Sequence, residues 1–462
     1  MEIISSHWIY FAGILIIILT MLMRKNVVVP AILMTFLIGL IYTGSLSTGL
    51  QTIFNASLVP PESFLASFLL PSPLFSKDLK SLEANEQMIK PFGKIMTNGH
   101  ISYLVIILVT YVISLFFWPT PAVPLVGALL LPVAIRAGLP PIAGAAAIAI
   151  AGQGMALSSD YIIQIAPMLS ATAAGVSGQA VADRALLLSI ITGVAALTIA
   201  YLMIRKQIQQ KNDRHLEKWM EGKRIEKRTE ATRKGKAFAI IVPVTFAVVI
   251  CYMLYTTFFT DLSLKGETGA ALIGGVALLL LIAASVFYKP RQVFENVSDC
   301  MVDGFLFAFK AMGPVIPIAG FFFLGSDEFS ASILGTETAP AFLFDLVQSG
   351  QHLIPEHAAW TAFGILIIGM ITGLDGSGFS GLPLTGALSG ALGPVAGVDP
   401  ATLAAIGQMG AIWVGGGTLI AWSSLVAVAG ISRVNVQTLV RICFIPVITG
   451  LLLSTLFAVL FL

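Results

Sequence analysis

Five short motifs each occur twice in this chain, in the same order in its two halves. The second copies follow the first by 255 to 259 residues. One such match arises easily by chance in an apolar chain, but five in one order indicate an internal repeat. The paired segments are Pro124–Leu129 with Pro383–Leu388, Gly138–Pro141 with Gly397–Pro400, Gly152-Gln153 with Gly407-Gln408, Ala174–Ser177 with Ala429–Ser432, and Arg184–Gly193 with Arg441–Gly450. The chain is therefore expected to fold as two related units.

Composition places these two units in a membrane. Apolar residues make up 57% of the 462 residues and charged residues 11%, whereas soluble domains carry about 25% charged residues. We therefore predict a multi-pass protein of the cell (plasma or inner) membrane. The three cysteines have no paired spacing and the histidines form no cluster, so we expect no disulfide framework, redox chemistry or cofactor. Arg24-Lys25 follows the first apolar segment, which predicts a retained span and not a cleaved signal peptide.

Apolar segments of about 20 residues are long enough to cross the hydrocarbon core. In the first half we predict spans at 8–23, 27–45 and 50–72, an amphipathic interfacial helix at 76–98, hairpin arms at 100–118 and 124–137, a broken span within 140–175, and a helix at 185–204. In the second half we predict spans at 237–257, 268–288 and 304–325, an amphipathic helix at 327–353, hairpin arms at 358–373 and 383–396, a broken span at 400–413 and 418–430, and a final helix at 438–460.

The first hairpin is predicted to be re-entrant because its second arm, 124–137, would be only about 21 Å long. Each half then has five crossings, one re-entrant hairpin and a broken helix. An odd number of crossings inverts the second half relative to the first. The predicted fold class is an all-α polytopic membrane protein built from two inverted repeats, 1–204 and 237–462, joined by the linker 205–236.

The charges agree with this inversion. The linker holds 12 of the 26 lysines and arginines, which marks it as a cytoplasmic loop. With the linker inside, 24 of the 26 basic residues lie on the cytoplasmic side and both termini lie outside. Five acidic residues are interleaved in the linker, and apolar spans flank it, so we interpret it as a solvated connector and expect no nucleic-acid partner.

Four interruptions of the apolar sequence at matching positions define the predicted site. They are the two hairpin tips and the breaks in the two broken spans. Each break frees backbone groups and exposes helix ends that favour ions. The candidate substrate-binding residues are Thr120, Ser158, Ser159, Ser377, Ser380, Gly416, Gly417, Thr418, Ser423 and Ser424.

Four further residues are candidates for ion coupling, namely Asp160, Asp375, Gln153 and Gln408. A carboxylate at bilayer depth costs about 2.5 to 3.5 kcal/mol and is usually retained for an ion or a proton. The alternative is that Asp375 caps the second hairpin arm and that Ser158-Ser159-Asp160 is a helix N-cap cluster. For the two glutamines the alternative is hydrogen bonding between packed helices.

The remaining intramembrane cations are expected to serve no site. Arg136, Arg184, Lys310 and Arg441 fall near predicted helix ends, where long side chains reach the interface. The glycine-rich segments 376–378 and 415–417 lack the lysine of a phosphate-binding loop. We therefore expect neither ATP-driven transport nor an enzyme.

The arrangement of hairpin, broken helix and closing helix in each half resembles the ion transporter superfamily of elevator-type secondary carriers. This group includes citrate, dicarboxylate and gluconate permeases and sodium/proton antiporters. The tips carry Pro119-Thr120-Pro121 and Gly376–Gly378 in place of the paired Ser-Asn-Thr signatures of divalent anion/sodium symporters. The sequence therefore does not indicate dicarboxylate specificity.

The resemblance also implies a division of labour within each half. The first three spans, 1–75 and 237–326, would form a scaffold that dimerises. The segments 76–98 and 327–353 would be interfacial arms. The segments 99–204 and 354–462 would form the moving transport part. By this resemblance we expect a homodimer.

The sequence thus supports two functional hypotheses. The first is a secondary active transporter that moves a small organic anion, such as a carboxylate, coupled to Na⁺ or H⁺. In it, Asp160 or Asp375 takes the cation, so a bound Na⁺ is the one ion expected. The second is a monovalent cation/proton antiporter in which the same two aspartates exchange the ions.

Overall fold

The computed structural model describes residues 3–23, 25–58, 94–116, 119–220, 233–259, 266–288, 290–313, 315–349, 357–376, 378–421 and 424–462. Every regular element in these ranges is a helix. Four of the described helices are long and apolar enough to cross a membrane, namely Gly99–Phe116, Pro141–Ser159, Gly178–Gln207 and Val436–Phe461. The prediction of an all-helical polytopic membrane protein is thus confirmed at this level.

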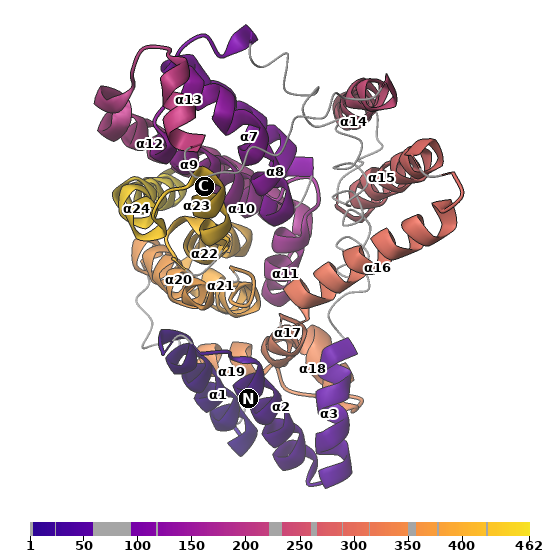
Figure 1. Cartoon of the computed structure of the whole chain (residues 1–462). Helices are drawn as coiled ribbons and strands as arrows, with labels where there is room; N and C mark the ends of the chain where they lie inside the picture. The colour runs from indigo at the N-terminus through magenta and orange to yellow at the C-terminus, as the bar shows by residue number, and fades with distance from the viewer. Residues whose placement is uncertain are drawn as a thin grey trace.

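One group of helices lies at the bottom of Figure 1 and is formed by segments far apart in the chain. It contains α1 (Ser5–Leu22), α2 (Val28–Thr43), α3 (Leu46–Leu58), α17 (Val315–Phe323), α18 (Asp327–Leu334) and α19 (Phe342–Ser349). Tyr10 stacks on Phe321 with ring centroids 5.0 Å apart, and its hydroxyl donates to the Phe322 carbonyl. His7 and Asp345, both buried, contact each other at 3.2 Å. Aromatic packing, side-chain hydrogen bonds and the His7–Asp345 pair thus join the two halves here.

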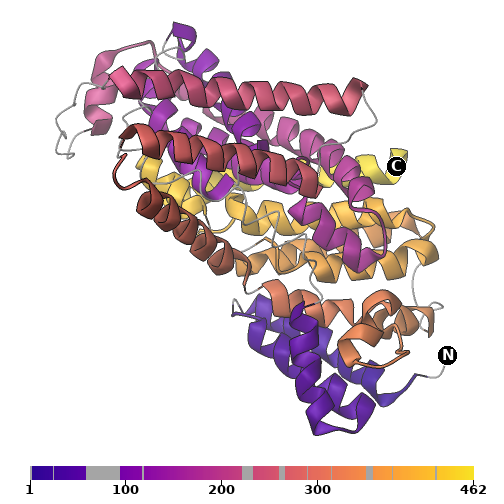
Figure 2. The same cartoon turned by 90° about the vertical axis from the view of Figure 1, so that its right-hand side faces the viewer.

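A second group stands to one side and faces the viewer in Figure 2. It consists of α14 (Arg233–Phe259), α15 (Gly266–Tyr288) and α16 (Val293–Met312). Phe238 and Ile273 from this group belong to one apolar cluster with Phe116 and Ile162 of the first half. The group therefore packs against the first half of the chain and not only against its own.

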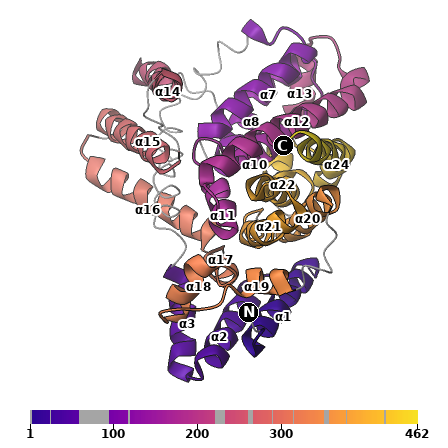
Figure 3. The same ribbon diagram turned by 180° about the vertical axis from the view of Figure 1, so that it is seen from behind.

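The central bundle contains the hairpins and the broken helices, and Figure 3 shows it from behind. From the first half come α7 (Gly99–Phe116), α8 (Pro119–Arg136), α9 (Pro141–Ile148), a π-helical segment (Ala149–Ala156), α10 (Leu157–Ser159), α11 (Ile165–Ala174) and α12 (Gly178–Ile204). From the second half come α20 (Ala358–Thr372), α21 (Leu382–Ala396), α22 (Pro400–Trp413), a π-helical segment (Val414–Thr418), α23 (Leu425–Ser432) and α24 (Val436–Phe461). Helix α12 packs along α24, and α11 packs along α21.

Two predicted helices of the second half are wrong. The predicted span 304–325 is divided between α16, which ends at Met312, and α17, which begins at Val315. Position 314 is a proline, which supplies no amide donor to a continuous helix. The predicted amphipathic helix 327–353 is divided into α18 and α19. Gly335 ends α18 in the left-handed conformation with φ +67°, which glycine adopts without a steric penalty.

Smaller differences concern the first half. Thr120 and Pro121 lie in the first turn of α8 and not in an open hairpin tip. Helix α12 begins at Gly178, where Ser177 caps it by accepting a hydrogen bond from the Ala180 amide at 3.2 Å. The predicted span 50–72 is described only as far as Leu58, and most of the predicted interfacial helix 76–98 lies outside the described residues.

The described first part of the basic linker keeps its side chains exposed or half-buried, as a solvated connector does, but it is also docked on the bundle. Helix α13 (Asp213–Met220) makes a bidentate ion pair from Asp213 to Arg136 at the end of α8. This guanidinium holds the pKa of the exposed Asp213 carboxyl below its usual range. At the other end of α13, the Trp219 indole donates to the Ser432 carbonyl at 3.0 Å, and Arg433 lies over its ring at 5.2 Å.

Trp219→Ala should release α13 from α23. It removes one hydrogen bond and one cation–π contact, together worth about 1 to 2 kcal/mol. Trypsin should then cleave after Lys211 and Arg214 about five to thirty times faster in inverted membrane vesicles, as mass spectrometry of the fragments would show. Glu217→Ala, an exposed substitution on the same helix, should leave the rate unchanged. Equal rates for all three proteins would contradict the docking.

Candidate functional site

The breaks in the two broken helices lie against each other in the middle of the bundle. The first follows the π-helical segment Ala149–Ala156, where Asp160 (φ +37°) and Gln164 (φ +62°) adopt left-handed backbone. The second is the π-helical segment Val414–Thr418, in which Gly417 has φ +125°. Both π-helical segments are entirely buried. The predicted broken spans are therefore present, and their irregular backbone is covered by protein, as a membrane interior requires.

Glycines bring the two segments into backbone contact. A Cβ atom at Gly154 would lie 2.5 Å from Cζ3 of Trp413, so the indole ring occupies the space of a side chain. A Cβ at Gly416 would lie 3.2 Å from the carbonyl oxygen of Gln153, and one at Gly417 would lie 3.3 Å from its Cβ. The predicted glycine run thus contacts the backbone of the other half.

The two repeat-equivalent glutamines behave differently. Gln408 on α22 is fully satisfied, because its amide donates to the Ser158 carbonyl at 2.8 Å and its oxygen accepts from the Ser170 hydroxyl at 3.2 Å. Gln153 is completely buried, and neither its amide nitrogen nor its oxygen has a hydrogen-bond partner. The packing alternative therefore describes Gln408, whereas Gln153 has free donor and acceptor capacity.

Other buried polar groups around the first π-helical segment also have no partner. They are the Thr110 and Ser114 hydroxyls on α7 and the Trp413 indole nitrogen. A Cβ at Gly152 would lie 3.2 Å from the Ser114 Oγ and 2.9 Å from the Thr110 methyl Cγ2, so both side chains lie beside the residue preceding Gln153. Buried polar atoms are normally paired, and leaving one unpaired costs about 1 to 3 kcal/mol. Such a concentration is typical of a place where a ligand or an ion supplies the partner.

The sequence prediction missed Thr110, Ser114 and Trp413. Thr110 and Ser114 are four residues apart in an otherwise apolar helix, so they lie on one face and form a polar stripe that periodicity reveals. Trp413 directly precedes the glycine run. The sequence does not mark it as a candidate binding residue, because a tryptophan in a membrane helix usually serves in packing or as an interfacial anchor.

The side chains of the Ser158-Ser159-Asp160 cluster are hydrogen-bonded to neighbouring parts of the protein. The Ser158 hydroxyl bonds to Ser189 at 3.2 Å, and Ser159 donates to the Ala156 carbonyl at 3.1 Å. The Asp160 carboxylate accepts from the Ala166 amide at 2.8 Å in the first turn of α11. The helix-cap alternative is thus realised for Asp160, whose negative charge lies at the positive end of a helix.

The second break is also stabilised from within. The Thr418 hydroxyl donates to the Trp413 carbonyl, and Ser424 donates to the Gly416 carbonyl at 2.6 Å. Ser380 is buried beside the second hairpin turn, where the 3₁₀ turn Gly373–Asp375 ends α20. The side chains of Thr120 and Asp375, and the whole of Ser377 and Ser423, lie outside the described residues.

The structure brings together Gln153, Ser158, Gln408, Gly416 and Gly417, from both halves of the chain. Thr418 and Ser424 join this group through the second break. No cluster of histidine, cysteine and carboxylate side chains able to hold a metal occurs in the part of the chain that the structure describes. The described site is thus made of hydroxyl, amide, indole and backbone groups.

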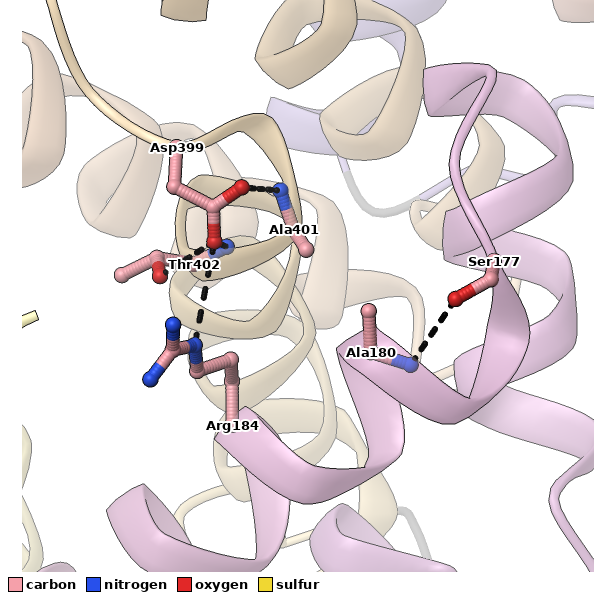
Figure 4. Close-up of polar contacts among 6 residues, drawn as sticks. All are labelled: Ser177, Ala180, Arg184, Asp399, Ala401 and Thr402. Carbon is pink, nitrogen blue, oxygen red and sulfur yellow. Dashed lines mark hydrogen bonds and ion pairs between the residues drawn. The ribbon is translucent and has the colours of Figure 1, made fainter.

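Arg184 is paired, contrary to the prediction that it only reaches the interface. Its Nε lies 3.7 Å from the Asp399 carboxylate, which also caps α22 by accepting from the Ala401 and Thr402 amides (Figure 4). The pair joins α12 of the first half to α22 of the second. Asp399-Pro400 is the sequence signal for this cap, because an aspartate before a proline at the first helical position is typical of a helix start.

The fold and the described site define an all-helical membrane protein with two broken helices that contact each other. No known protein-family profile matches the chain. It is 37% identical over 470 residues to a Bacillus subtilis (strain 168) protein described as the uncharacterized membrane protein YhfA, covering 100% of this chain and 99% of that protein. The chain therefore belongs to the same membrane-protein family as YhfA.

Gly417→Ala should destabilise the second break. The φ of +125° is strained for any side chain, and the new Cβ would lie 2.4 Å from the Ser424 Oγ. We expect the free energy of unfolding in detergent micelles to fall by about 1 to 3 kcal/mol. Gly430→Ala in α23 meets nothing within 4 Å and should raise stability slightly. Equal stability of the two variants would contradict the backbone conformation assigned to Gly417.

Proposed function

We propose that this protein is a secondary active transporter that moves a small organic anion, such as a carboxylate, and couples the movement to Na⁺ or H⁺. The observation that carries the proposal is a set of buried, unpartnered polar atoms. Those of Gln153 and Trp413 lie where the two broken helices meet, and those of Thr110 and Ser114 lie on α7, which packs against the first broken helix. Midplane breaks that present free backbone and neutral polar groups are typical of transporter binding sites. A fixed pore or a purely structural bundle would not need them.

The polar groups suit a small anion better than a large apolar ligand. The Trp413 indole and the Gln153 amide are hydrogen-bond donors, and the Thr110 and Ser114 hydroxyls can donate or accept. Donors of this kind can hold a carboxylate without a buried arginine, and the oxygen atoms can ligate Na⁺. Asp375 at the second hairpin turn is proposed as the coupling carboxylate. Asp160 is the second choice, because its carboxylate already caps α11.

We also propose that the protein belongs to the ion transporter superfamily and that its two halves have inverted orientations in the membrane. Supporting it, each half supplies a helical hairpin, a helix that continues through a π-helical segment into a break, and a long closing helix. The closing helices α12 and α24 pack along each other. In the elevator scheme the bundle moves against α1–α3 and α14–α16 in a homodimer, with both termini outside.

Gln153→Leu separates a binding role from a packing role. If Gln153 binds the substrate, the leucine variant should take up substrate at least ten times more slowly. Its free energy of unfolding should be unchanged or rise by about 1 kcal/mol, because two unpaired buried polar atoms are removed. Uptake would be measured in proteoliposomes against a panel of radiolabelled organic anions. The proposal fails if the Gln153→Leu protein transports as well as the wild type.

Gln408→Leu is the matched control, since Gln408 holds the equivalent position but is fully hydrogen-bonded. It leaves the Ser158 carbonyl and the Ser170 hydroxyl without these partners, so stability should fall by about 1 to 3 kcal/mol. A loss of stability for both variants would assign Gln153 to packing and would remove the observation on which the proposed site depends.

The antiporter is the second candidate function, favoured by the buried Asp160, whose carboxylate makes no ion pair among the described residues. Asp160→Asn keeps an oxygen that can accept from Ala166 but cannot ionise, and Asp375→Asn changes the other candidate in the same way. For the organic-anion carrier, a pH-gradient dye in proteoliposomes should not respond to Na⁺ alone. Anion uptake should lose its ion dependence in Asp375→Asn.

A dye response to Na⁺ without any organic anion, lost in either asparagine variant, would establish the antiporter instead. Ion dependence that persists in Asp375→Asn and is lost in Asp160→Asn would move the coupling site to the first break. In that case the helix cap and the coupling group would be the same carboxylate.

A further inference from the structure

A groove with a volume of about 600 Å³ lies on the flank of the bundle beside the second break, where Val414 and Leu419 line it. Helix α20 supplies Ile367 and Ile371 to it, the second break supplies Leu419, and α24 supplies Val440 and Phe444. In Figure 1, α20 and α24 lie on the side of the bundle opposite α14–α16. The groove therefore does not open toward that neighbouring helix group.

The rim of the groove is apolar and open. Ile367 is 55% exposed and Phe444 is 53% exposed, and both lie on membrane helices of the bundle. In a membrane protein such surface faces acyl chains, because lipid is the surrounding solvent. Along α24 the groove runs from Gln437 to Ile448, about 16 Å at 1.5 Å per residue, which is roughly half of the ~30 Å hydrocarbon core.

One cation interrupts this apolar surface. Arg441 lines the groove with Gln437 one turn before it, and the other lining side chains are apolar. Among the described residues no carboxylate lies within ion-pair distance of Arg441. A guanidinium at the end of an apolar groove, with no counter-charge among the described residues, is complementary to an amphiphile with an anionic head, and its planar fork matches phosphate.

The internal repeat distinguishes Arg441 from its equivalent in the first copy. Arg184 holds the equivalent position in the first copy and is paired with Asp399. The residue equivalent to Asp399 in the first copy is Pro140, which carries no carboxylate.

We propose that this groove binds one anionic phospholipid, with part of an acyl chain along α20 and α24 and the headgroup phosphate on Arg441. The inference needs only that the protein lies in a membrane, and it is independent of the proposed transport function. Because the groove borders the second break at Leu419 and Ile420, a bound lipid would also support the non-helical backbone between α22 and α23.

The test is lipid binding to the purified full-length protein by native mass spectrometry, with phosphatidylglycerol and phosphatidylcholine of equal chain length as probes. Both headgroups carry a phosphate, but the choline cation neutralises phosphatidylcholine and is repelled by Arg441, so the wild type should prefer phosphatidylglycerol by about tenfold. Arg441→Gln should remove the preference and Arg441→Lys should largely restore it. Arg184→Gln, which removes the same charge at the equivalent position, should retain it.

A second pair of variants tests the apolar part. Ile367→Trp fills the groove and should weaken binding of both lipids, whereas Leu456→Trp, an equally lipid-facing substitution on α24, should not. Thermal unfolding of each variant establishes that it is folded.

Three results would overturn the proposal. The first is a headgroup preference that persists in Arg441→Gln. The second is complete competition by soluble glycerol phosphate, which would assign the groove to a water-soluble anion. The third is a dimer that becomes monomeric in Arg441→Gln while its lipid content stays the same, because a second copy would then occupy the groove.

Discussion

The structure depends on one constraint, which is that a helix can be broken inside a membrane only where protein covers the freed backbone groups. In this chain each of the two broken helices covers the freed backbone of the other. The π-helical segment that contains Gln153 lies against the one that contains Gly416 and Gly417. Glycine is required at this contact because any larger residue would hold the two backbones apart. The position of the candidate site therefore follows from the way in which both breaks are buried.

Much of this arrangement could be predicted from the sequence. The apolar segments, the second hairpin and both breaks follow from glycine, proline and polar residues that interrupt hydrophobic runs. The division of 304–325 and 327–353 could have been foreseen at Gly313-Pro314 and Gly335, but composition alone favoured continuous helices there. Pairings across the chain, such as Arg184 with Asp399, need three-dimensional packing, because no local pattern connects residues so far apart.

The candidate site was predicted less completely than the fold. Sequence patterns identify residues that can hydrogen-bond, but they do not show which of them already do so within the folded chain. Ser159 and Asp160 satisfy nearby backbone groups, whereas Gln153 does not, although all three residues are equally conspicuous in the sequence. The repeat sharpens this distinction, since Gln408 holds the same position as Gln153 with both of its polar atoms paired.

The docked linker helix α13 limits where the protein can bend. Asp213 holds the end of α8 through Arg136, and Trp219, two turns later, holds the end of α23 through the Ser432 carbonyl and Arg433. A helix of eight residues is too short and stiff to change its length. Helix α13 thereby links the end of α8 to the end of α23. Any movement that separates these two ends has to break the contacts of Asp213 or of Trp219, whereas a movement that keeps both contacts carries the two ends together.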